Sequence, residues 1–507
     1  MQTLEKTHPK FQELKIRLKE INHLECAAAL LYWDQATYMP PGGARARGEQ
    51  LATLDQIAHE KFTSEEFGQL LENLRSYENN LPYESDDASL IRVTRRKYEK
   101  AVRVPARFMA KLSEHQTQTY EVWAKARPNS DFKMVQSYLE KTLELSREYA
   151  DFFPGYEHIA DPLIDQLDYG MKTSTVQKLF NQLRKELVPI VENICNQAPT
   201  NDDCLRQHYP EAQQLDFTIR IIKQLGYDFQ RGRQDTTHHP FMIPFSIGDV
   251  RITTRVYEND LDQALFSTIH EMGHGLYEQG IDPSYEGTPL ASGTSSGVHE
   301  SQSRLWENIV GRSRSFWTFF YPKLQGFFPE QLEQVSLDTF YRAINKVKRS
   351  LIRTDADEVT YNLHVMIRFD LEIQMLEGSL SIKDLPEAWN ELYFKSLGIK
   401  PTKDSEGVLQ DVHWYTGKIG GMFQGYTLGN LISCQFFDAA TLAHPEISTQ
   451  IAKGNFTTLH SWLKENIHQH GKKYTPEELI KLVTGKKLCI EPFINYIKTK
   501  YGELYSL

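Results

Sequence analysis

Apolar residues recur at spacings of three and four over most of this 507-residue chain. Phe11, Leu14, Leu18, Ile21 and Leu24 predict a helix over residues 10–32, which stops at the turn-rich WDQATYMPPGG. The same period predicts helices at about 44–62, 63–76, 86–103, 105–126, 131–153 and 173–197. We therefore expect a mainly α fold whose first 200 residues are stacked helices.

The start of the third predicted helix has its own signal. Thr63 and Glu66 have the spacing of a capping box, in which each side chain bonds to the backbone N–H of the other residue.

One segment departs from the helical period. In DVRITTRV, residues 249–256, the aliphatic residues and Thr254 fall on one side, while the charged residues and Thr253 fall on the other. This alternation predicts a strand with one polar face. Asn259 and Asp260 follow as good N-caps, so a helix should begin at LDQALFSTIHEMGHGLYEQG and end near Gly280.

Inside that predicted helix lies HEMGH. His270 and His274 are four residues apart, so both imidazoles project from one face, one turn apart, as two ligands of a tetrahedral zinc would. Glu271 is offset by about 100 degrees, near enough to reach a metal-bound water without being a ligand. Two core histidines would give the same spacing, so the pattern needs a third ligand.

A glutamate on the following helix supplies a candidate ligand. The metzincin subclass is excluded because Gly280, not His, stands six residues after His274. Glu300 lies 26 residues after His274, near the start of an amphipathic helix that Ser295 or Ser296 can cap. An ordinary first-turn glutamate, favoured by the helix dipole, is the alternative. With three protein ligands, one position stays open for water, whose proton Glu271 can accept and pass to a leaving amine.

The composition argues against nucleic-acid binding, membrane insertion and a disulfide-based fold. The charge balance is 57 basic against 67 acidic residues without a dense basic block, so nothing favours nucleic-acid binding. Mean hydropathy is −0.50, and no apolar run is long enough for a membrane span. The five cysteines are odd in number and lack a C-x-x-C, which fits neither a disulfide framework nor a thiolate zinc site. Without an apolar signal segment, the cytoplasm is the default location.

Several motifs together resemble the carboxypeptidase Taq family of metallocarboxypeptidases. They are HEMGH, HESQ at 299–302, DVRIT at 249–253, IRTDADE at 352–358, GVLQDVHW at 407–414, and LLYWDQATYMPPGG near the N-terminus. They recur in order across nearly the whole chain. The resemblance implies a helical zincin-type body with a deep narrow active-site groove, a small sheet beside the metal helix, and commonly a homodimer. It implies one Zn²⁺ per chain, with Co²⁺ as an alternative, and peptide substrates with a free C-terminus.

The resemblance also implies roles for individual residues. It makes His270, His274 and Glu300 the metal ligands and Glu271 the general base and acid. An exopeptidase must bind a terminal carboxylate, a task suited to arginine, and the resemblance associates Arg251 and Arg353 with it. From the residues alone, Arg251 is equally a solvent-exposed strand residue. Arg353 lies in a long helical stretch, and without the resemblance a surface ion pair with Asp357 at i+4 is the favoured interpretation.

The GVLQDVHW segment and a later tyrosine complete the predicted site. By similarity, Gln410, Asp411 and Trp414 line the groove. His413 and Tyr426 are candidates to stabilise the tetrahedral oxyanion, and each has a plain alternative as a loop histidine and one of 25 tyrosines. His239, before a proline, could approach the site or be an ordinary loop histidine.

We predict a cytosolic zinc carboxypeptidase that releases single residues from peptide C-termini. Residues 1–507 would form one catalytic domain, with about 1–200 covering the groove and about 201–507 carrying the chemistry. An oligopeptidase that cuts internally on the same scaffold is one alternative. The other is a non-catalytic helical scaffold with a structural metal, although such sites favour cysteine and none lies between residues 270 and 300.

Overall fold

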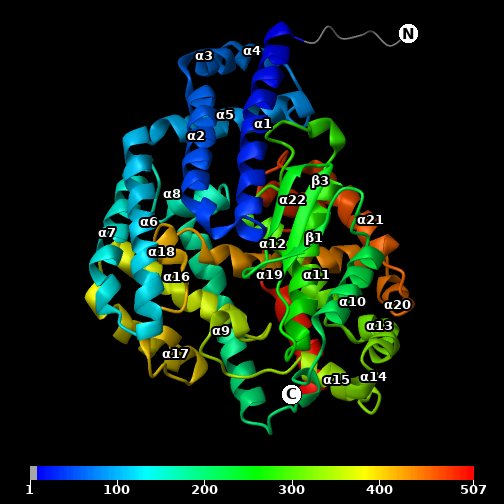
Figure 1. Ribbon diagram of the computed structural model, residues 1–507. Coiled ribbons are helices and arrows are strands. Elements are labelled where there is room, and N and C mark those ends of the chain that lie inside the picture. Colours follow the sequence, from blue (N-terminus) through cyan, green and yellow to red (C-terminus); the bar gives the residue numbers. More distant parts are fainter. Residues whose placement is uncertain (1–7) are drawn as a thin grey trace, which may run out of the picture.

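The computed structural model describes residues 8–507, and helices dominate it (Figure 1). The helices before residue 200 are α1 (Pro9–Thr37), α2 (Ala44–Thr63), α3 (Glu65–Asn73), α4 (Arg75–Asn79), α5 (Asp86–Arg103), α6 (Ala106–Asn129), α7 (Lys133–Asp151), α8 (Asp161–Leu167) and α9 (Thr173–Cys195). The later α-helices are α10 (Glu211–Leu225), α11 (Leu261–Gly280), α12 (Ser296–Arg304), α13 (Arg314–Phe327), α14 (Pro329–Leu332), α15 (Leu337–Ile344), α16 (Tyr361–Glu377), α17 (Leu385–Leu397), α18 (His413–Thr416), α19 (Phe423–Ala443), α20 (Ile447–Ile451), α21 (Thr457–Asn466), α22 (Pro476–Thr484) and α23 (Glu491–Tyr505). The mainly α prediction is confirmed.

The N-terminal helices follow the predicted period with two local differences. The first helix continues through the predicted stop and ends at Thr37, because nothing breaks it before Pro40. The capping box at Thr63 and Glu66 is wrong. The Thr63 hydroxyl donates to the His59 carbonyl within α2, and Ser64 caps α3 by accepting from the Phe67 N–H.

Buried apolar side chains gather in two clusters. The smaller joins one face of α1, with Phe11, Leu14 and Leu18, to α2, α3, α5 and the 281–290 segment. The larger runs from α6 to α23 and includes the apolar residues of α11 and α12. Figure 1 shows α1 and α2 side by side at the top of the view, with their lower ends beside the sheet. The apolar face of this N-terminal hairpin belongs to a cluster separate from the one around α11.

The sheet has three strands in the order β1 (Gln234–Thr236), β3 (Asp249–Thr254), β2 (Met242–Ser246). Strand β1 pairs with β3 in parallel and β2 pairs with β3 antiparallel. Pro244, which lacks an N–H, is tolerated because β2 is an edge strand. The predicted strand is β3, with Val250 and Ile252 fully buried. Its other face is less polar in practice, because Thr253 is buried and its hydroxyl bonds to the Phe241 backbone.

Helix α11 begins directly after this sheet. As predicted, it begins at an acidic cap, with the Asp260 carboxylate accepting from the Gln263 N–H, and it ends at Gly280. It packs against β3, where the Thr268 hydroxyl bonds to the Thr254 hydroxyl at 2.9 Å. Fifteen of the twenty residues of α11 are buried, so the helix is held by packing on several sides, and His270 and His274 are among the few that are only partly buried.

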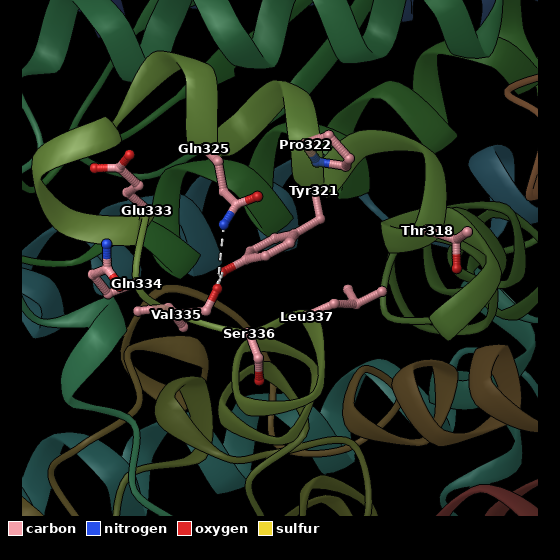
Figure 2. Close-up of a pocket in the computed structure, with 9 residues that line it drawn as sticks. All are labelled: Thr318, Tyr321, Pro322, Gln325, Glu333, Gln334, Val335, Ser336 and Leu337. Atoms are coloured by element: carbon pink, nitrogen blue, oxygen red, sulfur yellow. Dashed lines mark hydrogen bonds between the residues drawn. The ribbon is translucent and has the colours of Figure 1, made fainter.

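Two further observations bear on function. Among residues 8–507, no helix combines the length and apolar character that crossing a membrane requires. A surface hollow lies between α13 and the start of α15, where the Tyr321 hydroxyl and the Gln325 amide both donate to the Val335 carbonyl (Figure 2). This hollow shares no residue with the predicted site.

Candidate metal centre and active site

The two histidines and the glutamate predicted as ligands lie together. His270 and His274 project from α11, and Glu300 projects from α12. The Glu300 Oε2 atom is 3.5 Å from His270 Nε2 and 3.4 Å from His274 Nε2. One ligand atom from each residue lies within 4.8 Å of the others, so the three can hold a metal ion. Two imidazoles and a carboxylate are a donor set typical of catalytic zinc.

Glycines let the third ligand come this close. A Cβ on Gly273 of α11 would stand 2.7 Å from the Gln302 carbonyl oxygen and from the Ser303 Cα of α12. A Cβ on Gly429 of α19 would stand 2.5 Å from the Glu300 side chain. Both contacts are shorter than real Cβ contacts, so α11, α12 and α19 approach one another only because these positions lack side chains.

His270 is oriented by a carboxylate that the sequence analysis missed. Helix α12 runs directly into a π-helix, η4 (Leu305–Val310), whose Glu307 Oε2 is 2.9 Å from His270 Nδ1. The Arg304 guanidinium bonds to both Glu300 and Glu307, at 2.7 and 3.1 Å. Because an ionised carboxylate only accepts, His270 donates from Nδ1, so Nε2, which faces Glu300, is the nitrogen that can bind a metal ion. π-Turns of this kind occur often at functional sites.

His274 is oriented through a second histidine. His274 Nδ1 lies 2.6 Å from His299 Nδ1, and His299 Nε2 lies 2.8 Å from a carboxylate oxygen of Glu278. Glu278 is buried and also accepts from the Gly293 N–H at 3.0 Å. Both ligand imidazoles are therefore held at Nδ1, so their Nε2 atoms converge on Glu300.

The charges of the centre favour a cation. Burial raises the pKa of Glu300, but the charges of Arg304 and His270 outweigh it, so that carboxyl stays ionised. Burial lowers the pKa of His274 to about 3, which leaves its imidazole neutral and able to act as a ligand. Burial opposes a charge on His270 too, but Glu300 and Glu307 raise its pKa overall. Glu300 thus presents an ionised carboxylate oxygen to both imidazoles, at the place where a cation would bind.

Glu271 is buried beside this centre. Burial raises its pKa to about 7; His270 opposes that rise, and Glu300 and Glu307 add to it. Among residues 8–507, none donates a hydrogen bond to its carboxylate, so the group is free to act on a molecule bound next to the ion. A pKa near 7 suits a group that must both accept and return a proton.

A second charged cluster contains Arg353. The side chain is buried, and its Nη2 lies 2.7 Å from Asp411 Oδ1. Arg368, fully buried on α16, bonds to the other oxygen of Asp411. The Gln410 side-chain oxygen accepts from the Arg353 backbone N–H at 2.9 Å and from Arg368 Nη2 at 2.7 Å. Asp411 and Gln410 therefore hold both arginines in place.

The structure corrects the alternative placed on Arg353. The residue lies in a short 3₁₀ turn, η5 (Arg353–Asp355), not in a long helix. Its carboxylate partner is Asp411 rather than Asp357, whose oxygens accept from the Lys348, Val359 and Thr360 N–H groups instead. A surface ion pair between Arg353 and Asp357 is thus excluded.

His413 and Tyr426 face each other near Arg353. His413 Nε2 is 3.2 Å from the Tyr426 hydroxyl, and the Arg353 guanidinium lies 5.2 Å from the centre of the Tyr426 ring. Burial lowers the pKa of His413 to about 4 and raises that of Tyr426 well above its usual value. At neutral pH the pair is thus an uncharged imidazole and a protonated phenol, and either can donate a hydrogen bond to an oxyanion.

Tyr361 connects this cluster to the metal ligands. Its hydroxyl accepts from Arg353 Nη1 at 3.0 Å, and its ring lies beneath the Arg304 guanidinium, 4.5 Å from the ring centre. Arg304 in turn bonds to Glu300. The predicted ligands and the predicted arginine therefore belong to one continuous site.

The remaining predicted residues lie as follows. The Arg251 guanidinium bonds to Asp249 with two contacts of 2.8 Å and lies between the rings of Trp33 and Phe245. Trp414 is buried, and its indole N–H donates to Glu372 of α16 at 2.7 Å. His239 lies between β1 and β2 and is exposed, but partial burial of its ring and the charge of Arg353 lower its pKa, so it approaches the Arg353 cluster as one alternative predicted. None of these three contacts the His270, His274 and Glu300 group in the described part of the chain.

Residues that the sequence analysis did not single out include Glu278, His299, Arg304, Glu307, Tyr361 and Arg368. Two had a visible signal. His299 stands next to Glu300 inside HESQ, and Glu307 lies seven residues after Glu300, a spacing that returns to the same helical face. Arg368 lies mid-helix, and no local pattern separates it from a surface arginine.

Comparison with known proteins bears on this site. A family profile described as "Carboxypeptidase Taq (M32) metallopeptidase" matches residues 13–501. The chain belongs to this family. It is 38% identical to thermostable carboxypeptidase 1 of Thermus thermophilus, over 98% of this chain and 99% of the relative. It is 36% identical to carboxypeptidase 1 of Bacillus subtilis, over 97% of each.

Solved structures of the family have the same fold. The crystal structure of a carboxypeptidase from Deinococcus radiodurans R1 matches with a TM-score of 0.96 at 47% identity, covering 99% of this chain and 100% of that one. Metallocarboxypeptidase 1 of Trypanosoma cruzi matches with a TM-score of 0.92 at 29% identity, covering 97% and 99%. The predicted family is confirmed, and the protein is a metallocarboxypeptidase, a peptide hydrolase with a His-His-Glu group able to bind a metal.

Proposed function

We propose that this carboxypeptidase uses a zinc ion held by His270, His274 and Glu300 to remove single residues from the C-termini of peptides. The observation that carries the proposal is that the Nε2 atoms of His270 and His274 converge on one oxygen of the ionised Glu300 carboxylate. Nitrogen and oxygen donors in this ratio suit Zn²⁺, and Co²⁺ is an alternative with the same ligands. No cysteine is needed.

A bound ion would polarise the scissile carbonyl and increase the acidity of a water molecule. The residues of the chain supply the proton transfers. Glu271 accepts the proton of the attacking water and gives it to the departing amine nitrogen, which converts a poor leaving group into a neutral amine. Its burial and its pKa near 7 support both halves of this role.

His413 and Tyr426 would donate to the oxygen that becomes negative during attack. Both are half-buried rather than sealed in the core, and neither is charged at neutral pH. A hydrogen bond from such a donor strengthens as the carbonyl oxygen gains charge, so it lowers the barrier rather than merely binding the substrate.

Arg353 would bind the terminal carboxylate of the peptide. Its contacts to Asp411 and Tyr361 use three of its five N–H groups, leaving one on each terminal nitrogen. Arg353 and Arg368 carry two positive charges, whereas Asp411 carries one negative charge. The nearby Glu372 compensates only in part, because burial raises its pKa to about 7. An anion is therefore favoured here, and a carboxylate fits two parallel N–H groups.

The other predicted site residues are assigned weaker parts in the proposal. Gln410 and Asp411 position Arg353 rather than contact substrate, and Trp414 supports the segment from the core side. Arg251 remains a second candidate for substrate binding, with its aromatic neighbours and Asp249 keeping its guanidinium in place. A deep narrow groove, a single domain over 1–507, a homodimer and a cytoplasmic location stay predictions.

The alternatives differ in their products. An oligopeptidase would cut internally, and a scaffold with a structural metal would not cut at all. The test is a digest of an N-terminally blocked peptide by metal-free, zinc-restored and cobalt-restored protein, read by mass spectrometry. We expect loss of one C-terminal residue at a time, dependent on metal. Internal fragments, or unchanged cleavage after complete metal removal, would reject the proposal.

A further inference from the structure

A chain of three side chains runs from the buried Glu278 carboxylate to the ligand histidine His274. Glu278 and His274 are four residues apart on α11, and His299 from α12 lies between them. The contacts are 2.8 Å between Glu278 Oε1 and His299 Nε2, and 2.6 Å between the Nδ1 atoms of His299 and His274. His299 therefore connects the two helices immediately before the ligand Glu300.

The direction of each hydrogen bond follows from what the groups can donate. An ionised Glu278 only accepts, and it already accepts from the Gly293 N–H, so the proton in the first contact belongs to His299 Nε2. A histidine that binds a metal ion through Nε2 carries its proton on Nδ1, so His274 is the donor in the second contact and His299 Nδ1 accepts. His299 then carries its own proton on Nε2, which donates to Glu278.

We propose that His299, held by Glu278, is a positioning residue that keeps His274 in the tautomer presenting Nε2 to the metal ion. This inference rests on the proposed metal centre. His270 receives the same support directly from Glu307, so the two ligands are oriented independently. Partners of this kind change metal affinity by about 10- to 100-fold when they are removed.

The ring of His299 also fills space, so the test must separate packing from hydrogen bonding. It lies 4.7 Å from the His274 ring and 5.1 Å from the Tyr277 ring, centre to centre. His299→Phe keeps a ring but removes both nitrogens. His299→Gln keeps one acceptor and one donor on a side chain of similar reach. His460→Phe, at a half-buried histidine of α21 outside the metal centre, is the matched control.

The measurements are the zinc dissociation constant from competition with a chelator, the melting temperature of the metal-free protein, and the absorption spectrum with cobalt. We expect zinc to bind about 10- to 100-fold more weakly to His299→Phe and the cobalt spectrum to change. His299→Gln should recover part of the affinity, and His460→Phe should bind as the wild type does. If His299→Phe lowers the melting temperature but leaves the zinc affinity and the cobalt spectrum unchanged, the inference is overturned and His299 is only a packing residue.

A further variant keeps this result apart from the proposed function. His274→Ala should abolish tight zinc binding if the metal centre is correct. If His274→Ala binds zinc like the wild type, the metal centre is wrong and the inference falls with it. If His274→Ala loses zinc while His299→Phe keeps it, only the role given to His299 is wrong.

Discussion

Replacing Arg353 by methionine tests how the enzyme distinguishes a chain end from the middle of a peptide. Methionine has a similar length and no charge, and Asp411 keeps Arg368 as a partner, so no buried carboxylate is left alone. Two charge-assisted hydrogen bonds to the substrate would be lost, each worth about 1.5–3 kcal/mol. We therefore expect kcat/KM for a free-acid peptide to fall by roughly 10²- to 10⁴-fold.

The decisive assay pairs this variant with a modified substrate. Release of the C-terminal residue is measured for the same peptide as a free acid and as a C-terminal amide, with wild type and with Arg353→Met. The amide cannot accept charge-assisted bonds, so the variant should lose at most about tenfold on it. Arg95→Met is the matched control, because that arginine of α5 is also mostly shielded from solvent and pairs with a carboxylate, that of Glu78 at 2.9 Å, but has no predicted part in the site. An equal loss on both substrates would refute carboxylate recognition by Arg353.

Two other substitutions separate chemistry from stability. Glu271→Gln should retain zinc, measured by chelator competition, and lower kcat by about 10²- to 10⁴-fold; a variant that keeps kcat would exclude a proton-transfer role. Burial raises the pKa of Asp411, but the charges of Arg353 and Arg368 outweigh it and hold that pKa well below its usual value. The ionised carboxyl therefore stabilises the folded state at pH values above the usual pKa, and this stabilisation is lost as the pH falls through the folded-state pKa. Asp411→Asn should therefore lower the free energy of unfolding, measured with urea, by about 3–5 kcal/mol at pH 7 and by less at acidic pH. A cost independent of pH would show that the charge is unimportant.

The sequence predicted the metal group because the two histidines follow from helical periodicity and the family resemblance selected Glu300 from among the possible third ligands. A helix places His270 and His274 on one face, and the motif of the next helix supplies Glu300. Strand β3 was visible because the alternation in the sequence continues over residues 249–256, of which Asp249–Thr254 form the strand. Its partners β1 and β2 are three and five residues long, and one contains proline, so neither has a readable period.

The supporting residues could not be predicted in the same way. Arg353 was placed in a long helical stretch, which made Asp357 four residues later its alternative partner, but the chain turns there, and the true partner lies 58 residues further on. Arg368 lies in the middle of a helix, and no local pattern marks its bond to Asp411, 43 residues later. Pairings of this kind depend on how distant segments meet, which local patterns do not encode.

The spaces at Gly273 and Gly429 have a consequence for variation in this enzyme. A single added methyl group at either position would push α12 or the Glu300 side chain away from the histidines, although alanine is a better helix former than glycine. Substitutions at Gly273 and Gly429 should therefore inactivate the enzyme although neither residue takes part in the chemistry. Engineering that keeps only the reactive side chains fixed would therefore leave the distance between the ligand-bearing helices open to change.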